Sequence, residues 1–355
     1  MAILDIFKRK QVKDDRTKNP TVSQDSIAYN SGGRKTFTED YNDYVSSVET
    51  LDKVTRIIAN VASMAKIEVM KDVSGELKPL KVKNVDLDFA INENDSQADF
   101  LRKTFSSIFS HGAAIILAQK SRETGFIGFY PYNPASFAIE ATESSLVNEF
   151  IYTSESGTEM KFAPKDVIYI NNTIDITNLV YPISRLAPLN DMLTLQANIM
   201  KQTTDFYASG SKDSVMVSPK EPMSAENAFQ LKGIFDDFIQ SRQTRTLFLN
   251  TEVDVERVSN AQSPREIMEA MTAINKIIVE SYGIPEYLYG SYTGHVNDAA
   301  VKTACRLFFE VQLKPVFKAF DHQMTKYFRN TLKLKNAIIK TSFNDVEILH
   351  DSLDT

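Results

Sequence analysis

The chain has 355 residues, 43% of them hydrophobic and 24% charged, which is an ordinary globular balance and allows two or three domains with a sizeable core. Its net charge of −6 argues against a protein whose main task is to grip nucleic acid through a basic face. The single cysteine, Cys305, excludes an intrachain disulfide, and we interpret it as a packed small residue in an apolar helical stretch. No segment approaches the roughly 20 apolar residues of a membrane helix.

Residues 1–44 are predicted to be a flexible N-terminal arm. The start, "MAILDIFKRK", places a short apolar run before basic residues, the reverse of the order in a secretory signal. Polar residues without a helical or strand period follow, and they include the pair Gly32-Gly33. We expect order to begin near Asp40.

Residues 45–185 are predicted to form an α+β unit. Apolar residues recur at helical spacing between Val45 and Met64, and again in "SQADFLRKTFSSIFSHG", which Gly112 is expected to end. The apolar run "AAIILAQK" and several alternating segments after it are typical of antiparallel strands. The sheet is therefore expected mostly after residue 112.

Two long helices are predicted to flank a compact insert at 210–262. The first runs from Leu186 to Ala208, and the second starts at Pro264, where Ser263 and Glu266 would form a capping box. At 1.5 Å per residue each helix is roughly 30 Å long. An insert at the far end of such a pair would be held away from the rest of the chain.

The loop 284–298 is predicted to have two halves. "GIPEYLYG" indicates a packed corner, with Tyr287 and Tyr289 against helix ends, whereas "SYTGHVND" is polar and suits a mobile segment that carries function. A helix at 299–330, bent near Pro315, is expected next. Residues 331–355 are expected to give one strand and an acidic tail.

No pattern in the chain demands catalysis or a cofactor. The four histidines are not at metal-ligand spacing from one another, from a cysteine or from a carboxylate, and motifs for hydrolases, phosphate loops and dinucleotide binding are missing. The pair Asp236-Asp237 is most simply solvated helix surface. We therefore predict no catalytic residue, no metal and no cofactor.

Across residues 45–345 the sequence resembles the portal proteins of tailed bacteriophages. The resemblance depends on the order of several short elements: a helix, a turn, a polar loop and a long helix that contains "LKP". In this chain those elements are Gly283, Ile284, Pro285, Leu288, Gly290, Asn297, Ala299 and Leu313-Lys314-Pro315.

The resemblance implies an α+β, portal-like subunit. Its parts would be a wing (45–185, with the C-terminal segments), stem helices (186–209 and 263–283), a clip (210–262), a tunnel loop (284–298) and a long bent helix (299–330), with little or no crown. Such subunits would form a ring, usually of twelve, at one capsid vertex of the virion, after assembly in the host cytoplasm.

The resemblance also implies partners. Double-stranded DNA would pass non-specifically along tunnel-loop residues Ser291, Tyr292, Thr293, His295 and Asn297. The clip would meet the large terminase and later the head–tail adaptor, with Lys232, Asp236, Asp237, Arg242 and Arg245 as candidate contacts. The major capsid protein would surround the ring, no membrane would be involved, and the terminase would supply the energy.

Two other classes remain as alternatives at this point. The chain could be an adaptor or scaffold of a phage head that forms no DNA channel, or an enzyme whose site follows no known motif. Deleting residues 291–296 would separate the first alternative from a portal, because only a portal needs that loop to package or retain DNA.

Overall fold

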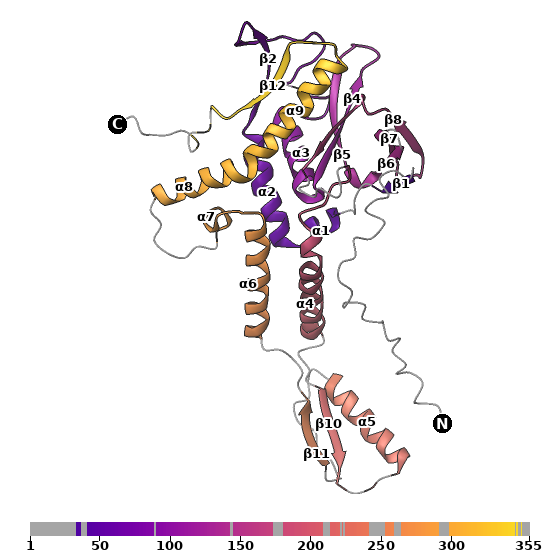
Figure 1. The fold of residues 1–355 in the computed structure, drawn as a ribbon. Helices are drawn as coiled ribbons and strands as arrows, with labels where there is room; N and C mark the ends of the chain where they lie inside the picture. The colour runs from indigo at the N-terminus through magenta and orange to yellow at the C-terminus, as the bar shows by residue number, and fades with distance from the viewer. Residues whose placement is uncertain are drawn as a thin grey trace, which may run out of the picture.

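In the computed structural model, two helices project from an α+β body and a smaller unit lies beyond their far ends (Figure 1). The structure describes residues 33–36, 41–88, 90–142, 145–172, 180–208, 214–220, 222, 224–240, 253–258, 264–290, 298–344, 346 and 349. The projecting helices are α4 (Asn190–Ala208) and α6 (Pro264–Ser281). The smaller unit, called the distal unit, consists of β10, α5 and β11. The body consists of the described elements other than the distal unit and the two projecting helices. The mixed helix and sheet content confirms the predicted α+β class.

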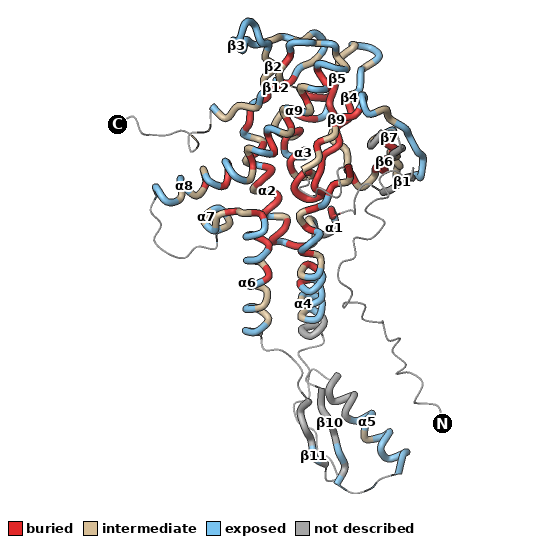
Figure 2. The backbone as a smooth tube through the Cα atoms, in the orientation of Figure 1, coloured by how far each residue is buried: buried red, intermediate tan, exposed pale blue. Residues whose placement is uncertain are grey.

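Three helices form most of the body's core: α2 (Glu49–Ser63), α3 (Gln97–His111) and α9 (Lys314–Asn330). Their apolar stripes meet, and the buried positions appear as the red segments of Figure 2. Helix α3 begins and ends as predicted. Ser96 caps it by accepting a hydrogen bond from the backbone of Asp99, and Gly112 ends it with φ +79°, a conformation that suits glycine.

Strand β4 (Ala113–Lys120) lies at the centre of a sheet ordered β5-β4-β9, between β5 (Ile127–Tyr132) and β9 (Val167–Asn171). Successive side chains of a strand point to opposite faces. Ala114 and Ile116 therefore join the helical core, while Ile115 and Leu117 join a second apolar cluster. Burial on both faces explains why this strand reads as a continuous apolar run.

The second cluster is closed by a sheet ordered β1-β6-β7-β8. Its strands are β1 (Gly33–Thr36), β6 (Phe137–Thr142), β7 (Ser145–Thr153) and β8 (Glu159–Phe162). The expectation that order begins near Asp40 is wrong, because residues 33–36 pair antiparallel with β6. Backbone hydrogen bonds to a sheet edge need no apolar pattern, so the sequence carried no signal for this strand.

A third sheet joins distant parts of the chain in the order β12-β2-β3. It contains β2 (Lys66–Val73), β3 (Glu76–Pro79) and the C-terminal β12 (Ala337–Ser342), which pairs with β2. The predicted C-terminal strand is thus confirmed.

The predicted long helix is present and bends where it was expected to (Figure 1). It consists of α8 (Asp298–Phe308), a π-helical turn (Phe309–Leu313) and α9, with Pro315 in the first turn of α9. A π turn followed by a proline is a recognised cause of a kink, because both interrupt the regular ladder of hydrogen bonds. Cys305 is buried on α8, as its interpretation as a packed residue requires.

The distal unit consists of β10 (Ser214–Pro219), α5 (Ala225–Gln240) and β11 (Val253–Val258), with β10 antiparallel to β11. The predicted cap Ser263 lies outside the described residues. Within the part of the chain that the structure describes, no helix combines the length and apolarity needed to cross a membrane.

Candidate functional site

A chain of polar contacts joins the two projecting helices to the body. On α6, Asn275 uses its side-chain oxygen to accept a hydrogen bond of 3.2 Å from Gln196 of α4 and one of 2.7 Å from Thr50 of α2. The Thr50 hydroxyl in turn accepts from Tyr289, 3.3 Å away. Gln196 and Thr50 are buried. Because buried polar groups are costly when unpaired, these contacts specify one arrangement of α2, α4, α6 and the segment after α6.

Among its described side chains, the helix pair is buried most near the body. Leu193, Ile274 and Ile278 are buried there. Farther along, Met200 on α4 and Met268 on α6 keep 54% and 66% of their surface exposed. Large apolar side chains left in water on both helices are typical of a surface that another chain covers.

The exposed apolar residues of α6 lie on opposite sides of that helix. Met268 and Ile277, both exposed, are nine positions apart, which is two and a half turns. The exposed arc between them carries Arg265, Glu269 and Lys276. A helix with an apolar residue on each side of a charged strip offers two different lateral faces.

The segment after α6 makes the predicted corner. Tyr282 is fully buried and donates a hydrogen bond of 3.1 Å to the backbone oxygen of Phe109, and burial raises the pKa of its phenol. Gly283 then takes a positive φ of +66°. A short helix, α7 (Glu286–Tyr289), follows, and Lys53 lies 4.3 Å above the ring of Tyr289. The two later tyrosines of this corner, Tyr287 and Tyr289, are half-buried.

A second contact ties this corner to the kinked helix. Arg185, just before α4, donates a hydrogen bond of 3.0 Å to Gln312 in the π turn and lies 4.9 Å from the ring centre of Phe109. Burial lowers the pKa of the Arg185 guanidinium. The Arg185 guanidinium therefore lies where three parts of the chain meet: the segment before α4, the end of α6 and the bend between α8 and α9.

Comparison with known proteins agrees with this architecture. A family model described as "Phage portal protein" matches residues 49–355. The chain belongs to the phage portal protein family. No curated protein matches the sequence significantly.

Solved structures of low sequence identity share the fold. The neck of an empty gene transfer agent particle contains a chain with 15% identity and a TM-score of 0.65, with 93% of this chain and 92% of that one covered. The virion of the native gene transfer agent particle contains one with 14% identity and a TM-score of 0.64, covering 91% and 89%. An HK97-family portal protein from Corynebacterium diphtheriae has 9% identity and a TM-score of 0.60, covering 90% and 99%.

The predicted DNA-contacting residues of this portal protein lie outside the described residues. They are Ser291, Tyr292, Thr293, His295 and Asn297. The structure defines both ends of their segment: Gly290 ends α7 with φ +85°, and Asp298 begins α8. The role of these residues stays a prediction.

The predicted partner contacts lie on or after α5 of the distal unit. Lys232 is exposed, Asp236 and Asp237 belong to the same helix, and Arg242 and Arg245 lie outside the described residues. Sequence reasoning missed an exposed aromatic residue of this helix, Phe229, which keeps 78% of its surface exposed. The sequence feature that could have revealed it is an aromatic residue among the polar residues of the first turns of a helix.

No cluster of three potential metal ligands occurs among the described residues. His111 is buried and held by neighbours: Ser110 lies 2.7 Å from its Nδ1, and the backbone of Tyr41 donates to its Nε2 at 3.4 Å. The structural signals that sequence reasoning did not find are Thr50, Asn275 and Gln312. Isolated polar residues in amphipathic helices give no hint of their partners until the helices are packed.

Proposed function

We propose that this chain is one subunit of a portal ring at a capsid vertex, and that DNA passes through the ring during packaging and ejection. The observation that carries the proposal, beside the family match, is the exposed apolar surface of the projecting helix pair. A closed ring needs two different complementary faces on each subunit. Met268 and Ile277 supply an apolar residue on each side of α6.

In this proposal the parts of the chain have separate tasks. Residues 45–185 and the C-terminal segments act as the wing, α4 and α6 as the stem, and residues 210–262 as the clip. The loop 284–298 is the tunnel loop, and Ser291, Tyr292, Thr293, His295 and Asn297 line the channel. The chain of polar contacts through Gln196, Asn275, Thr50 and Tyr289, called the polar relay, supports this assignment. It holds the start of the loop rigidly on the stem.

The clip is the docking surface for other proteins. The large terminase binds it during packaging and supplies the energy, and the head–tail adaptor binds it after filling. The exposed Phe229 beside Lys232 supports a protein partner, because an aromatic residue in water next to charge is typical of an interface anchor. The chain itself performs no catalysis. It assembles in the host cytoplasm and remains in the virion against the major capsid protein.

Imaging of the purified protein tests the ring. We expect closed rings, usually of twelve subunits, in negative-stain or cryo-electron micrographs. Monomers or dimers under all concentrations and salt conditions would contradict the proposal.

A deletion tests the channel. Removing residues 291–296 should leave rings intact and impair packaging or retention of DNA in particles. Unchanged DNA content in particles that carry the deletion would favour an adaptor without a channel.

A further inference from the structure

The C-terminal part of the body has a charge opposite to that of the whole chain. Between residues 314 and 340 the sequence contains seven Lys or Arg residues and one acidic residue, although the chain carries a net charge of −6. Such segregation within an acidic protein indicates a surface with an anionic partner.

Two exposed lysines and an exposed histidine lie on one side of α9. Lys318, His322 and Lys326 follow each other at four-residue intervals and are exposed, while Phe320, Met324 and Phe328 on the other side are buried. Lys333 and Lys335 are also exposed and lie in the segment between α9 and β12.

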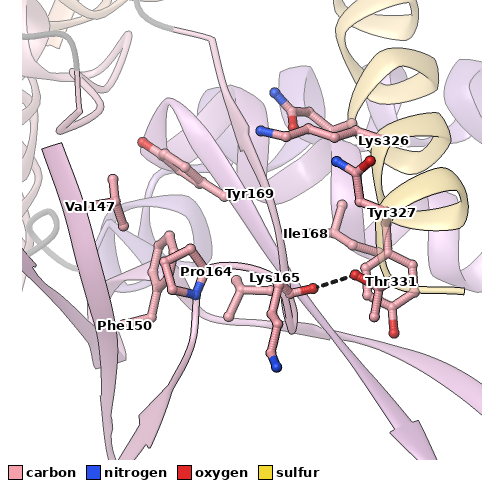
Figure 3. Close-up of a pocket in the computed structure, with 12 residues that line it drawn as sticks. Val147, Phe150, Pro164, Lys165, Ile168, Tyr169, Lys326, Tyr327 and Thr331 are labelled. Atoms are coloured by element: carbon pink, nitrogen blue, oxygen red, sulfur yellow. Dashed lines mark hydrogen bonds between the residues drawn. The ribbon is translucent and has the colours of Figure 1, made fainter. Parts of the chain in front are cut away.

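A hollow beside α9 adds a cation from another element. This cavity of about 370 Å³ lies between α9 and the β7–β9 region, and Lys165 and Lys326 both line it. Figure 3 shows Lys165 and Lys326 on different elements around the hollow, with the Thr331 hydroxyl donating to the backbone oxygen of Lys165. We define the basic surface as Lys165, Lys318, Lys326, Lys333 and Lys335.

Within the described residues, the surface is not neutralised by ion pairs. In the described part of the chain no carboxylate forms an ion pair with the ammonium groups of Lys165, Lys318, Lys326, Lys333 or Lys335. Among the described acids, Asp166 follows Lys165 in the sequence and is exposed, while Asp321 accepts hydrogen bonds of 3.1 Å from Thr341 of β12. The local excess of positive charge is therefore available to a ligand.

We propose that the basic surface binds the phosphate backbone of duplex DNA, independently of base sequence, at a second contact outside the tunnel loop. The choice of DNA rests on the proposed portal function, which brings duplex DNA to this protein. Lysine ammonium groups suit a sequence-independent contact, because they meet phosphates as point charges. The row from Lys318 to Lys326 spans about 12 Å along the helix, or about three to four base pairs of duplex.

The surface lies at the end of the body away from the distal unit. In Figure 1 the C-terminal end of α9 and the strands β2 and β12 are at the opposite extreme from β10, β11 and α5. DNA held there would lie against the wing, on the side of the ring opposite the proposed clip. The contact would therefore be separate from terminase docking.

The test measures binding of the full-length protein to a labelled 30-base-pair duplex by fluorescence anisotropy between 50 and 200 mM NaCl. The triple variant K318Q/K326Q/K335Q should bind at least about ten-fold more weakly at 100 mM salt. The slope of log affinity against log salt should fall by about 2 to 3, since each lost phosphate contact contributes about 0.9.

A matched triple variant, K81Q/K83Q/K120Q, serves as the control. These lysines are also exposed on the body and their loss changes the net charge equally, but acidic residues such as Asp86, Asp88 and Glu123 lie near them in the sequence. The control should bind DNA within about two-fold of the unmodified protein. An equal loss in both triple variants, or no loss in the first, would overturn the proposal.

Two further readouts separate the alternatives. Polyglutamate that displaced the duplex as efficiently, per charge, as unlabelled DNA would overturn the proposal in favour of an acidic protein partner. Electron microscopy of the same samples reports on the ring. If rings form but the triple variant K318Q/K326Q/K335Q binds DNA normally, this inference alone is contradicted. If no rings form but that variant shows the expected loss of binding, only the proposed portal function is contradicted.

Discussion

The guanidinium of Arg185 donates a hydrogen bond of 3.0 Å to the side-chain oxygen of Gln312, which lies 127 residues later in the chain. Gln312 belongs to the π turn between α8 and α9, and its amide also fills the space above Gly283. A single amide thus contacts the segment before α4, the corner after α6 and the kink of the long helix. π turns are rare and occur frequently at functional sites.

Replacing Gly283 with alanine should destabilise this junction. Its φ of +66° disfavours a side chain, and an added Cβ would lie 2.7 Å from the Gln312 amide nitrogen, so the Gln312 side chain, which also contacts Arg185, must shift. We expect a loss of about 1–3 kcal/mol in the free energy of unfolding, measured by urea denaturation. Gly233→Ala is the control: that glycine is helical with open space around it, so the change should not destabilise.

A double-mutant cycle separates strain from the clash. In a Gln312→Ala background, Gly283→Ala should cost less than it does alone, because the obstructing amide is gone. An equal cost in both backgrounds would contradict the role given to Gln312.

Asn275→Ala should loosen the root of the helix pair. The change removes the acceptor shared by Gln196 and Thr50, both of which are buried, and we expect a loss of about 1–3 kcal/mol in the free energy of unfolding. Asn275→Asp keeps the acceptor and should cost less. Thr272→Ala, one turn away and exposed, should change stability by less than about 0.5 kcal/mol. Equal effects of Asn275→Ala and Thr272→Ala in thermal and urea unfolding would contradict the relay.

Glutamate at either lateral position of α6 should weaken the ring without unfolding the subunit. Met268→Glu or Ile277→Glu would place a charge in an apolar contact, and we expect the concentration for half-assembly to rise at least about ten-fold in mass photometry. Lys276→Glu alters charge more, yet it lies in the exposed strip between them and breaks only an exposed ion pair. Assembly lost equally in all three variants would show a general charge effect instead.

The contact between α9 and β12 should make stability depend on pH in the acid range. Burial raises the pKa of Asp321 to about 6, from an ordinary value near 3.8. A carboxyl that binds its proton more tightly when folded adds stability below pH 4, and that stability is lost as pH rises through about 6. The free energy of unfolding of the unmodified protein should therefore fall between pH 4 and 7. The variant Asp321→Asn keeps an acceptor for Thr341 but does not titrate, and its fall should be smaller by up to roughly 2 kcal/mol. Parallel pH profiles of the two proteins would contradict this assignment.

Local signals in the chain determined most of the elements. The Ser96 cap, the Gly112 stop and Pro264 at the first position of α6 are decided within a few residues, because helix ends are satisfied by neighbouring side chains and backbone. The apolar run of β4 likewise indicated a strand, and two long helices around an insert are visible from periodicity alone. The order of these elements was also enough for the portal resemblance that the family match confirms.

The tertiary structure decided what periodicity cannot encode. Pairing of β1 with β6 and of β12 with β2 depends on backbone hydrogen bonds between segments far apart in the chain, which leave no side-chain pattern. The Thr50–Asn275 and Arg185–Gln312 contacts depend on how helices cross. The sequence does not distinguish an isolated polar residue that faces water from one that faces a partner. Ile277 lies at helical spacing from the buried Ile274, yet it is exposed, because the core covers only part of the apolar side of the helix. The sequence by itself thus determined the elements and their order, while packing alone decided which polar groups meet and which apolar side chains are left for another chain to cover.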